Sequence, residues 1–165
     1  MSTRSIAETG ADGTARRRVR DVMTISPACC VPETPVTEVA VLLAGHDCGA
    51  IPVVENRVTG RPVGVVTDRD VVCRVVALGR EPAETTAADC MTAPCITAAE
   101  DMALEECVAL MEGNRVRRIV VVNDSGVVCG IVAQADVARK ADERTVAAVL
   151  RRVSEPTGSS SDVGR

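Results

Sequence analysis

Four polar residues stand together at the end of an apolar run, in the stretch VGVVTDRDVV at residues 63–72. The β-branched residues before them favour a strand, and the valines after them indicate the start of a helix. Two interpretations fit this junction. In the first, Thr67 or Asp68 caps the helix and the other charges face water. In the second, the junction binds a ligand that carries hydroxyl groups and a phosphate.

The sequence around this junction occurs twice. RDVMT at residues 20–24 returns as ADCMT at residues 88–92, an offset of 68. Beyond a polar turn the offset falls to 66, and GVVTDRDV at residues 64–71 matches GIVAQADV at residues 130–137. The landmarks recur in the same order and the main length change falls in a turn, where it costs little. The chain is therefore read as two copies of one unit.

Each copy is predicted to be a β-α-β-β-α unit. Short strands are expected at residues 29–31 and 95–97, before two stripes of apolar residues at helical spacing. The stripes are formed by Val36, Val39, Ala40 and Leu43 and by Leu104, Cys107, Val108 and Met111. Gly45 and Gly113 stand where these two helices should end.

Two strands joined by a polar, glycine-containing turn follow in each copy, which is typical of a hairpin. The last helix of the first copy carries valines at 71, 72, 75 and 76 and should end before Gly79, and its counterpart should start near Gln134 or Asp136. We therefore predict an α+β fold in which two copies bury a shared apolar surface. The predicted boundaries are a tail at 1–18, the first repeat at 19–78, a linker at 79–87, the second repeat at 88–141, a C-terminal helix at 142–153 and a tail at 154–165. One helical turn is expected near residues 86–90.

Composition limits the classes of function. The 165 residues are 46% hydrophobic with no aromatic residue, so the core must consist of Val, Leu, Ile, Ala, Met and Cys. The net charge of −4 argues against general binding of nucleic acid, which needs a basic face. No apolar run approaches the roughly 20 residues of a membrane span, and the first 20 residues lack the apolar segment of a secretory signal. We expect a soluble, cytoplasmic protein that binds no nucleic acid and no membrane.

Eight cysteines and one histidine complete the inventory of reactive side chains. Most of the cysteines lie in apolar runs and no C-x-x-C pair occurs, so they are read as small buried hydrophobic residues. A zinc site built from His46, Cys48, Cys29 and Cys30 is the alternative, although the spacing is not diagnostic. One histidine leaves few general bases, so we expect no catalytic residue, no metal site and no enzyme.

The repeated motifs resemble those of a tandem CBS-domain pair, or Bateman module. Each copy has a D-x-M-T opening, an I-P-V-V-like strand and a G-h-h-T-x-x-D-like junction, where h is apolar, and the resemblance spans Val19 to about Lys140. The stretches TDRDVVCRVVALGREP and NRVRRIVVVNDSGVVCGIVAQADVAR are similar to small stand-alone CBS-pair proteins of the hypoxic response protein type, a stress-response class. The resemblance implies pseudo-twofold packing with two clefts, a homodimer, and a regulatory role in binding AMP, ADP, ATP or S-adenosylmethionine.

The resemblance also implies roles for residues of the first repeat. Asp70 is expected to accept hydrogen bonds from ribose hydroxyls and Thr67 to donate one to a phosphate, which the helix N-terminus would also favour. Gly64 would let the base approach the backbone closely. Ile51 and Pro52 match the apolar wall against which the base lies.

Cations for a phosphate are expected from Arg117 and Arg118, which in related modules reach from the second repeat toward the ligand of the first, and from Arg69. Alternatively these arginines lie at a solvated strand edge or pair with Glu55 or Asp124.

In the second repeat Ala133 replaces the threonine while Asp136 remains, so the second cleft is expected to bind more weakly, to be empty or to select a different ligand. Alternatively, Asp136 merely favours the local helix dipole.

Three functions follow as alternatives. The first is a sensor that binds an adenosine-containing nucleotide, needs no cofactor and acts on an unknown protein partner in trans. The second is a structural or interaction dimer with vestigial clefts, and the third is a redox responder that uses cysteines or a metal.

Overall fold

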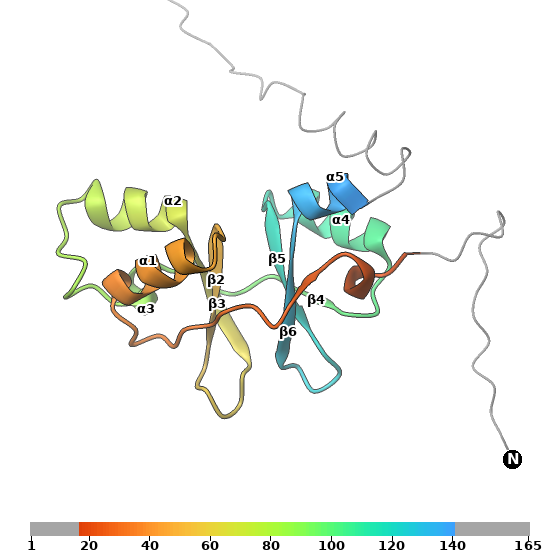
Figure 1. The fold of residues 1–165 in the computed structure, drawn as a ribbon, viewed down its shortest axis with the longest axis horizontal. Helices are drawn as coiled ribbons and strands as arrows, with labels where there is room; N and C mark the ends of the chain where they lie inside the picture. Colours follow the sequence, from red (N-terminus) through yellow and green to blue (C-terminus); the bar gives the residue numbers. More distant parts are fainter. Residues whose placement is uncertain (1–16, 141–165) are drawn as a thin grey trace, which may run out of the picture.

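The computed structural model describes residues 17–140, which form two similar halves with helices on their outer sides (Figure 1). In chain order, the first repeat comprises η1 (Val19–Asp21), β1 (Thr24–Ile25), α1 (Val36–Gly45), β2 (Ala50–Val54), β3 (Pro62–Thr67), α2 (Asp68–Val71) and the π-helical segment η2 (Val72–Val76), and its η1 and β1 pack against the second half. The second repeat comprises α3 (Ala87–Cys90), β4 (Thr97–Ala99), α4 (Leu104–Gly113), β5 (Arg118–Val122), β6 (Val128–Ala133) and α5 (Gln134–Lys140), and its α3 packs into the core of the first half. The predicted α+β class and the two repeats are confirmed.

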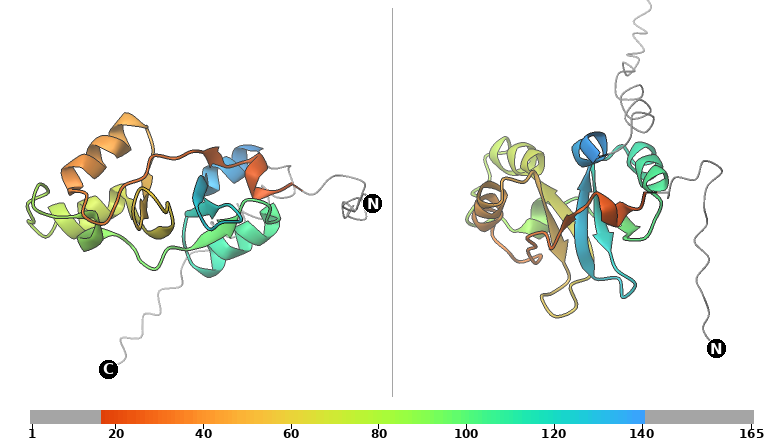
Figure 2. Two further views of the ribbon diagram at one scale, coloured as in Figure 1. Left: turned by 90° about the horizontal axis from the view of Figure 1, so that it is seen from below. Right: turned by 45° about the vertical axis from the view of Figure 1, so that its right-hand side comes forward.

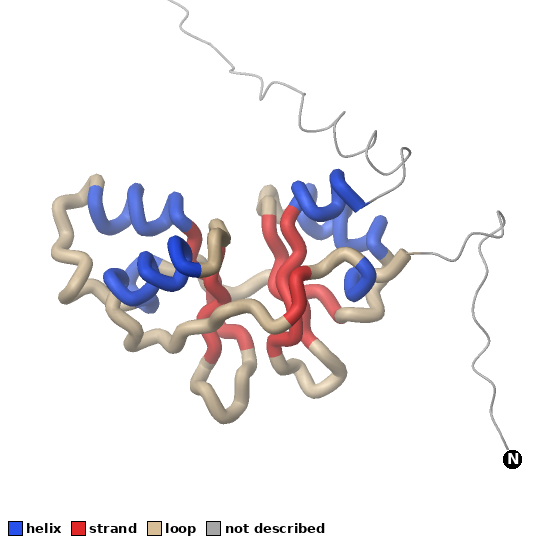
Figure 3. The backbone as a smooth tube through the Cα atoms, in the orientation of Figure 1, coloured by secondary structure: helices blue, strands red, loops and turns tan. Residues whose placement is uncertain are grey.

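Two small sheets occupy the middle of the molecule (Figure 3). In the first half β2 and β3 form an antiparallel hairpin, and Cys30 adds a single parallel bridge to Val53. In the second half β5 and β6 form the matching hairpin, and β4 pairs with β5 in parallel. Both predicted hairpins are therefore confirmed, and β-branched side chains fill their inner faces.

The opening segment of each repeat crosses to the sheet of the other repeat, as the two crossing stretches in Figure 1 and Figure 2 show. β1 pairs with β6, through Thr24 opposite Ile131. At the equivalent place in the first half, Thr92 exchanges two backbone hydrogen bonds with Val65, at 2.8 and 3.1 Å. Because backbone hydrogen bonds join each opening to the opposite sheet, the repeats are interlocked rather than merely stacked.

A methionine beside each crossing point packs onto a glycine of the opposite sheet. A Cβ atom on Gly64 would lie 2.5 Å from the Met91 sulfur, and one on Gly130 would collide with the Met23 sulfur. Only a residue without a side chain leaves room for the sulfur at these two positions. The D-x-M-T openings thus have a packing role that the pattern alone does not reveal.

Each half has its own apolar core, made of aliphatic side chains, cysteine and methionine as the composition predicts. The first core includes Ile51, Val53, Val66 and Val75, and the second includes Leu104, Ile119, Val121 and Met111 among its largest side chains. Cys30, Cys90 and Cys107 are buried in these cores, in agreement with their reading as hydrophobic residues.

The predictions of secondary structure hold with three adjustments. Helices α1 and α4 end at Gly45 and Gly113 as predicted, the linker helix is α3, and α5 begins at Gln134. The strand expected at 29–31 is reduced to one bridge, and the one expected at 95–97 lies at Thr97–Ala99 instead.

The third adjustment concerns the last helix of the first copy, which is split into α2 and η2. Of its valines only Val75 is fully buried, while Val72 and Val76 are exposed. The predicted helix at 142–153 lies outside the described residues. Within 17–140 the search for a helix both long and apolar enough to cross a bilayer found none.

Candidate functional site

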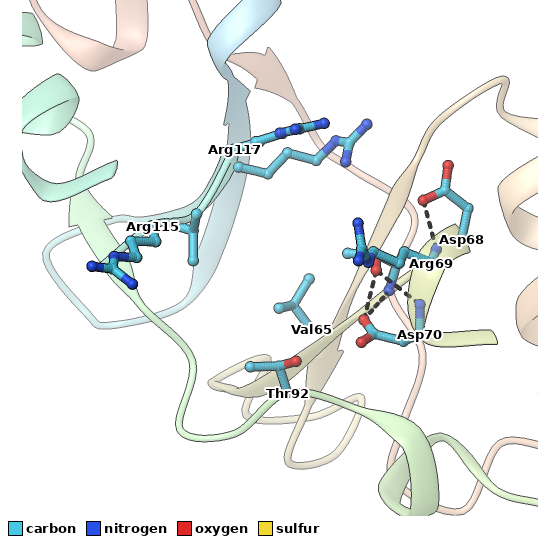
Figure 4. A pocket seen from close by; sticks show the side chains of 10 residues that line it. Val65, Asp68, Arg69, Asp70, Thr92, Arg115 and Arg117 are labelled. Carbon is cyan, nitrogen blue, oxygen red and sulfur yellow. Dashed lines mark hydrogen bonds between the residues drawn. The ribbon is translucent and has the colours of Figure 1, made fainter. Parts of the chain in front are cut away.

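A cleft of about 410 Å³ lies between the two repeats (Figure 4). The first repeat contributes Val65, Thr67, Asp68, Arg69 and Asp70. The second contributes Arg115, Val116, Arg117 and Arg118, and the crossing segment contributes Thr92. A volume of this size matches those of small-molecule sites, and the two repeats share its walls.

The Thr67–Asp70 turn of the first repeat forms one wall of the cleft. Asp70 Oδ2 accepts hydrogen bonds from the Thr67 amide at 2.8 Å and from the Thr67 hydroxyl at 2.6 Å, and the Asp70 amide donates back to that hydroxyl at 3.2 Å. This reciprocal arrangement is a capping box at the start of α2. Thr67 therefore caps the helix as the first interpretation holds, but Asp70 is largely buried instead of facing water, and its carboxylate also lines the cleft.

Asp70 keeps one oxygen that the cap does not use. Its Oδ1 lies 3.5 Å from the Arg74 guanidinium, and the side chain is only 12% exposed. Arg74 in turn donates to the carbonyls of Cys90 and Met91, at 2.8 and 2.9 Å. The carboxylate is thus connected, through one arginine, to the segment that crosses between the repeats.

The amides at the start of α2 do not form the phosphate site that the sequence suggested. The Asp68 amide donates to the Gly49 carbonyl at 3.4 Å, the Arg69 amide to Asp68 Oδ1 at 2.7 Å, and the Asp70 amide to Thr67. The hydroxyl proton of Thr67 is likewise committed to Asp70. Since these donors are already used, binding of a phosphate here depends mainly on side-chain cations.

Four arginines line the cleft, at positions 69, 115, 117 and 118. Among residues 17–140, none of their guanidinium groups forms an ion pair with an acidic side chain. Of the two acids expected as partners, Glu55 accepts a hydrogen bond from Thr59, and Asp124 forms no ion pair with these arginines. Figure 4 shows Arg117 directed toward the Asp68–Asp70 wall, whereas the Arg115 guanidinium is turned away from it. The cleft is therefore rich in available positive charge.

Arg118 reaches from the second repeat onto the first. Its guanidinium packs against Gly49, because a Cβ atom placed on that glycine would collide with it. Gly49 immediately precedes β2, and its carbonyl accepts the Asp68 amide. The contact brings the guanidinium to the wall that carries Asp70.

Three of the predicted residues lie outside the lining of this cleft. Ile51 is fully buried in the core of the first half and Pro52 is buried beside it in β2. The space beside Gly64 is filled by Met91, so no base can lie against that glycine in this arrangement. The alternation of a strand cannot by itself tell which face meets the core and which meets a cleft.

Aliphatic surface near the cleft comes from other residues. A small hollow of about 30 Å³ adjoins the cleft and shares Val65, Thr92, Val116 and Arg118 with it. Ile96, Val120 and Ile131 complete its apolar part together with Pro94. Sequence reasoning missed Val65, Thr92, Val116 and Arg115, because only the crossing of the chain brings them together. Arg115 alone could have been suspected as a cleft residue, from its position two residues before the Arg117–Arg118 pair.

The second predicted site contains Ala133 and Asp136. The Ala133 amide donates to Asp136 Oδ2 at 3.1 Å, which reproduces half of the capping box, and Arg139 pairs with Asp136 Oδ1 at 2.7 Å. Ala133 has no hydroxyl to complete the box. The contact with the Ala133 amide favours the alternative interpretation, in which Asp136 acts on the local helix dipole.

Burial suppresses thiol chemistry in several cysteines. Desolvation raises the pKa of Cys30 to about 12 and the pKa values of Cys95 and Cys107 to about 11, and it also raises the pKa values of Cys29 and Cys90. These thiols stay protonated at neutral pH, which makes them poor nucleophiles and poor metal ligands. In the described part of the chain, no three or more His, Cys, Asp or Glu side chains are grouped so as to hold a metal ion.

Comparison with known proteins identifies relatives of both repeats. The family model for the CBS domain matches residues 19–77 and 87–143. The chain is 40% identical over 118 residues to protein MK0525 of Methanopyrus kandleri, an alignment that covers 72% of this chain and 57% of that protein.

Two solved structures share the fold over most of their length. Hypoxic Response Protein I, solved with two coordinated zinc ions, has a TM-score of 0.67 at 30% identity, with 75% of this chain and 98% of that chain covered. The CBS-domain pair of protein MJ0100, in complex with 5-methylthioadenosine and S-adenosyl-L-methionine, has a TM-score of 0.65 at 27% identity, with 75% and 94% covered. The expected similarity to CBS-pair proteins of the hypoxic response type is confirmed.

Proposed function

Because the chain belongs to the CBS-domain family, we propose that it is a regulatory module that binds an adenosine-containing nucleotide between its repeats. The observation that carries the proposal is the cleft, in which a largely buried carboxylate of the first repeat faces arginines of the second that form no ion pair within residues 17–140. A module of this kind acts as a sensor through a protein partner rather than as a catalyst.

Each part of a nucleotide has a counterpart in the cleft. The capping box does not use Asp70 Oδ1, so this oxygen can accept hydrogen bonds from ribose hydroxyls. These bonds would replace its 3.5 Å contact with the Arg74 guanidinium. Arg117 and Arg118 supply cations for phosphate. Val65, Val116 and the adjoining apolar hollow offer aliphatic surface to the base, in place of the predicted Ile51 and Pro52.

A related structure supports the ligand class. The CBS pair of MJ0100 binds two adenosine derivatives, 5-methylthioadenosine and S-adenosyl-L-methionine. Because the two proteins share a fold, we propose adenosine-containing compounds as the ligand class of this chain. The candidates are AMP, ADP, ATP and S-adenosylmethionine.

The test is calorimetric titration of the full chain with these four compounds, repeated with Asp70→Ala and Asp70→Asn. Loss of the carboxylate should weaken binding at least tenfold in both variants, and Asp70→Asn keeps an oxygen that can accept from the Thr67 amide. If both variants bind as the wild type does, the carboxylate does not hold the ligand and this site assignment is wrong.

The linker helix offers a matched control. Asp89 forms the same capping box with Thr86, with the amide and the hydroxyl of Thr86 both 2.8 Å from its Oδ2, and it pairs with Arg80 at 3.7 Å. Asp89 does not line the cleft. Asp89→Ala therefore removes an equivalent cap without touching the ligand, and it should leave nucleotide affinity unchanged.

A homodimer is proposed from a separate surface. Val72, Val76 and Leu78, on η2 and the turn after it, are 57%, 60% and 68% exposed, and Val41 on α1 is 69% exposed. Aliphatic side chains exposed to this extent favour burial against a second copy. Light scattering should show a dimer for the wild type and a monomer for Val72→Glu/Val76→Glu, and a dimer in both would exclude this face.

The redox alternative is less favoured by the pKa values of the buried thiols. Thiolate chemistry at neutral pH requires a lowered pKa, whereas burial raises those of Cys30, Cys95 and Cys107.

A further inference from the structure

The two repeats differ sharply at the positions that line the cleft. The strand registers fix the equivalence, since Ala50 pairs with Thr67 in the first hairpin and Arg118 pairs with Ala133 in the second. Applying the offsets of 68 and 66 to the four cleft arginines gives their counterparts. Arg69, Arg115, Arg117 and Arg118 correspond to Ala135, Asp47, Gly49 and Ala50.

No counterpart of a cleft arginine is basic, and one of them is an aspartate. Thr67 likewise becomes Ala133, and the Asp136 that remains is already bound by Arg139 at 2.7 Å. The positive charge is thus concentrated on one side of the pseudo-twofold axis in a chain whose net charge is −4. Packing alone does not require this difference, because the two halves have the same fold.

Charge within the cleft is unbalanced in the absence of an anion. Four arginines but only two aspartates line it, and the Asp70 carboxylate is shared with Arg74 and the Thr67 cap. Arg118 packs over Gly49 and Arg117 points toward the same wall, so these like charges lie on one side of a single opening. An anion with several negative oxygens would relieve their repulsion, since guanidinium groups bind phosphate in a bidentate manner.

Resting on the proposed function, we infer that the cleft selects adenosine compounds with two or more phosphates, and that each chain binds one of them. S-adenosylmethionine, whose sulfonium carries a positive charge, is disfavoured, as is uncharged 5-methylthioadenosine. The equivalent region of the second repeat takes no phosphate, because the counterparts of the four cleft arginines are not basic and Arg139 is already paired with Asp136. This chain therefore differs in ligand charge from the MJ0100 pair to which it is similar.

The arginines should contribute unequally. Arg117 and Arg118 are directed at the first repeat, whereas the Arg115 guanidinium is turned away from it (Figure 4). Arg117→Gln and Arg118→Gln are expected to lower ATP affinity at least tenfold each, and Arg115→Gln by about threefold or less. Arg61→Gln is the matched control, because Arg61 is an exposed arginine on the hairpin turn outside the cleft.

The experiment is calorimetry of the full chain in metal-free buffer with adenosine, AMP, ADP, ATP, S-adenosylmethionine and inorganic triphosphate. We expect affinity to rise with phosphate number by about tenfold from AMP to ATP, S-adenosylmethionine to bind most weakly, and a stoichiometry of one nucleotide per chain. The gain from AMP to ATP should vanish in Arg118→Gln, and thermal midpoints establish that the variants are folded.

The outcomes separate this inference from the proposed function. If adenosine and S-adenosylmethionine bind as tightly as ATP, or if two nucleotides bind per chain with equal affinity, charge selection is wrong while adenosine binding stands. If triphosphate binds and no adenosine compound does, the proposed function fails and the cleft remains an anion site. If none of the compounds binds, both are wrong.

Discussion

Replacing Gly64 with alanine tests whether this glycine makes room for a ligand or for the chain itself. The added Cβ would lie 2.5 Å from the sulfur of Met91, 3.1 Å from its Cγ and 3.1 Å from the Thr92 carbonyl oxygen. The sulfur can move, but that carbonyl is backbone and accepts the Val65 amide at 3.1 Å. Overpacking of this kind costs about 2 kcal/mol of unfolding free energy, which lowers the thermal midpoint by about 4–8 °C in a chain of this size.

The matching control is Gly45→Ala at the end of α1, where a Cβ atom meets nothing within 4 Å. It should leave stability unchanged or raise it slightly, because alanine is the better helix former. Gly130→Ala should reproduce the Gly64→Ala loss, since the Met23 sulfur occupies the equivalent place. Urea denaturation followed by circular dichroism gives the free energies.

A double mutant locates the cause of the loss. If the new methyl group clashes with Met91, Gly64→Ala should lower the free energy of unfolding less in a Met91→Ala background than in the wild type. The expected coupling energy is about 1 kcal/mol. The reasoning is refuted if Gly64→Ala lies within 0.5 kcal/mol of wild type, or if it weakens ATP binding without any loss of stability. The latter result would mean that the space belongs to a base.

Further predictions concern the cleft and the buried thiols. Gly49→Ala should lower ATP affinity about threefold or more with little loss of stability, because the added methyl group displaces the Arg118 guanidinium without changing any charge. If calorimetry finds an unchanged affinity, the position of this guanidinium does not matter for binding. The pKa of Cys30 is raised to about 12 in the folded chain from an ordinary value of 9.0, so the unfolded chain loses this proton first and the free energy of unfolding should fall as the pH rises from about 9 to about 12. At pH 8 a thiol reagent should label exposed Cys73 in the native protein and label Cys30 only in urea, and native labelling of Cys30 seen by mass spectrometry would contradict its burial.

Sequence reasoning reached the repeat, both hairpins and the helix ends because each depends on local patterns. Val36, Val39 and Leu43 are buried at helical spacing, and Gly45 ends the helix as its position indicates. The crossing of β1 onto β6 was not predictable, since a two-residue strand has no periodicity of its own. It is this crossing that brings Met91 to Gly64 and fills the space in which the base was expected.

The site was predicted in part for the same reason. Thr67, Asp70, Arg117 and Arg118 follow from motif positions and do line one cleft. Thr92 enters it only because the crossing segment pairs with β3. The difference in arginine content between the two repeats, by contrast, can be found by aligning their sequences. It becomes informative only when the fold shows which of these positions line the cleft.

A bound nucleotide can regulate a partner only if it interacts differently with two arrangements of the protein. The ion pairs Asp70–Arg74, Arg80–Asp89 and Asp136–Arg139 each join residues fewer than ten positions apart, so none of them links the repeats. A polyphosphate held by the first repeat and by the arginines of the second adds an attraction between repeats that exists only in the bound state. Arg74 extends that change from Asp70 to the carbonyls of the crossing segment.

Restraint of one repeat relative to the other is therefore the output that this geometry favours. Amide hydrogen exchange should slow on ATP binding both at residues 91–96 of the crossing segment and at residues 115–118 of the second repeat, far apart in the sequence but joined at the cleft. Arg118→Gln should remove the slowing at 91–96 even at an ATP concentration high enough to saturate its weakened site, whereas Arg61→Gln should preserve it. Protection confined to the Thr67–Asp70 turn would mean that the nucleotide is held by the first repeat alone, and no restraint between repeats could then follow from binding.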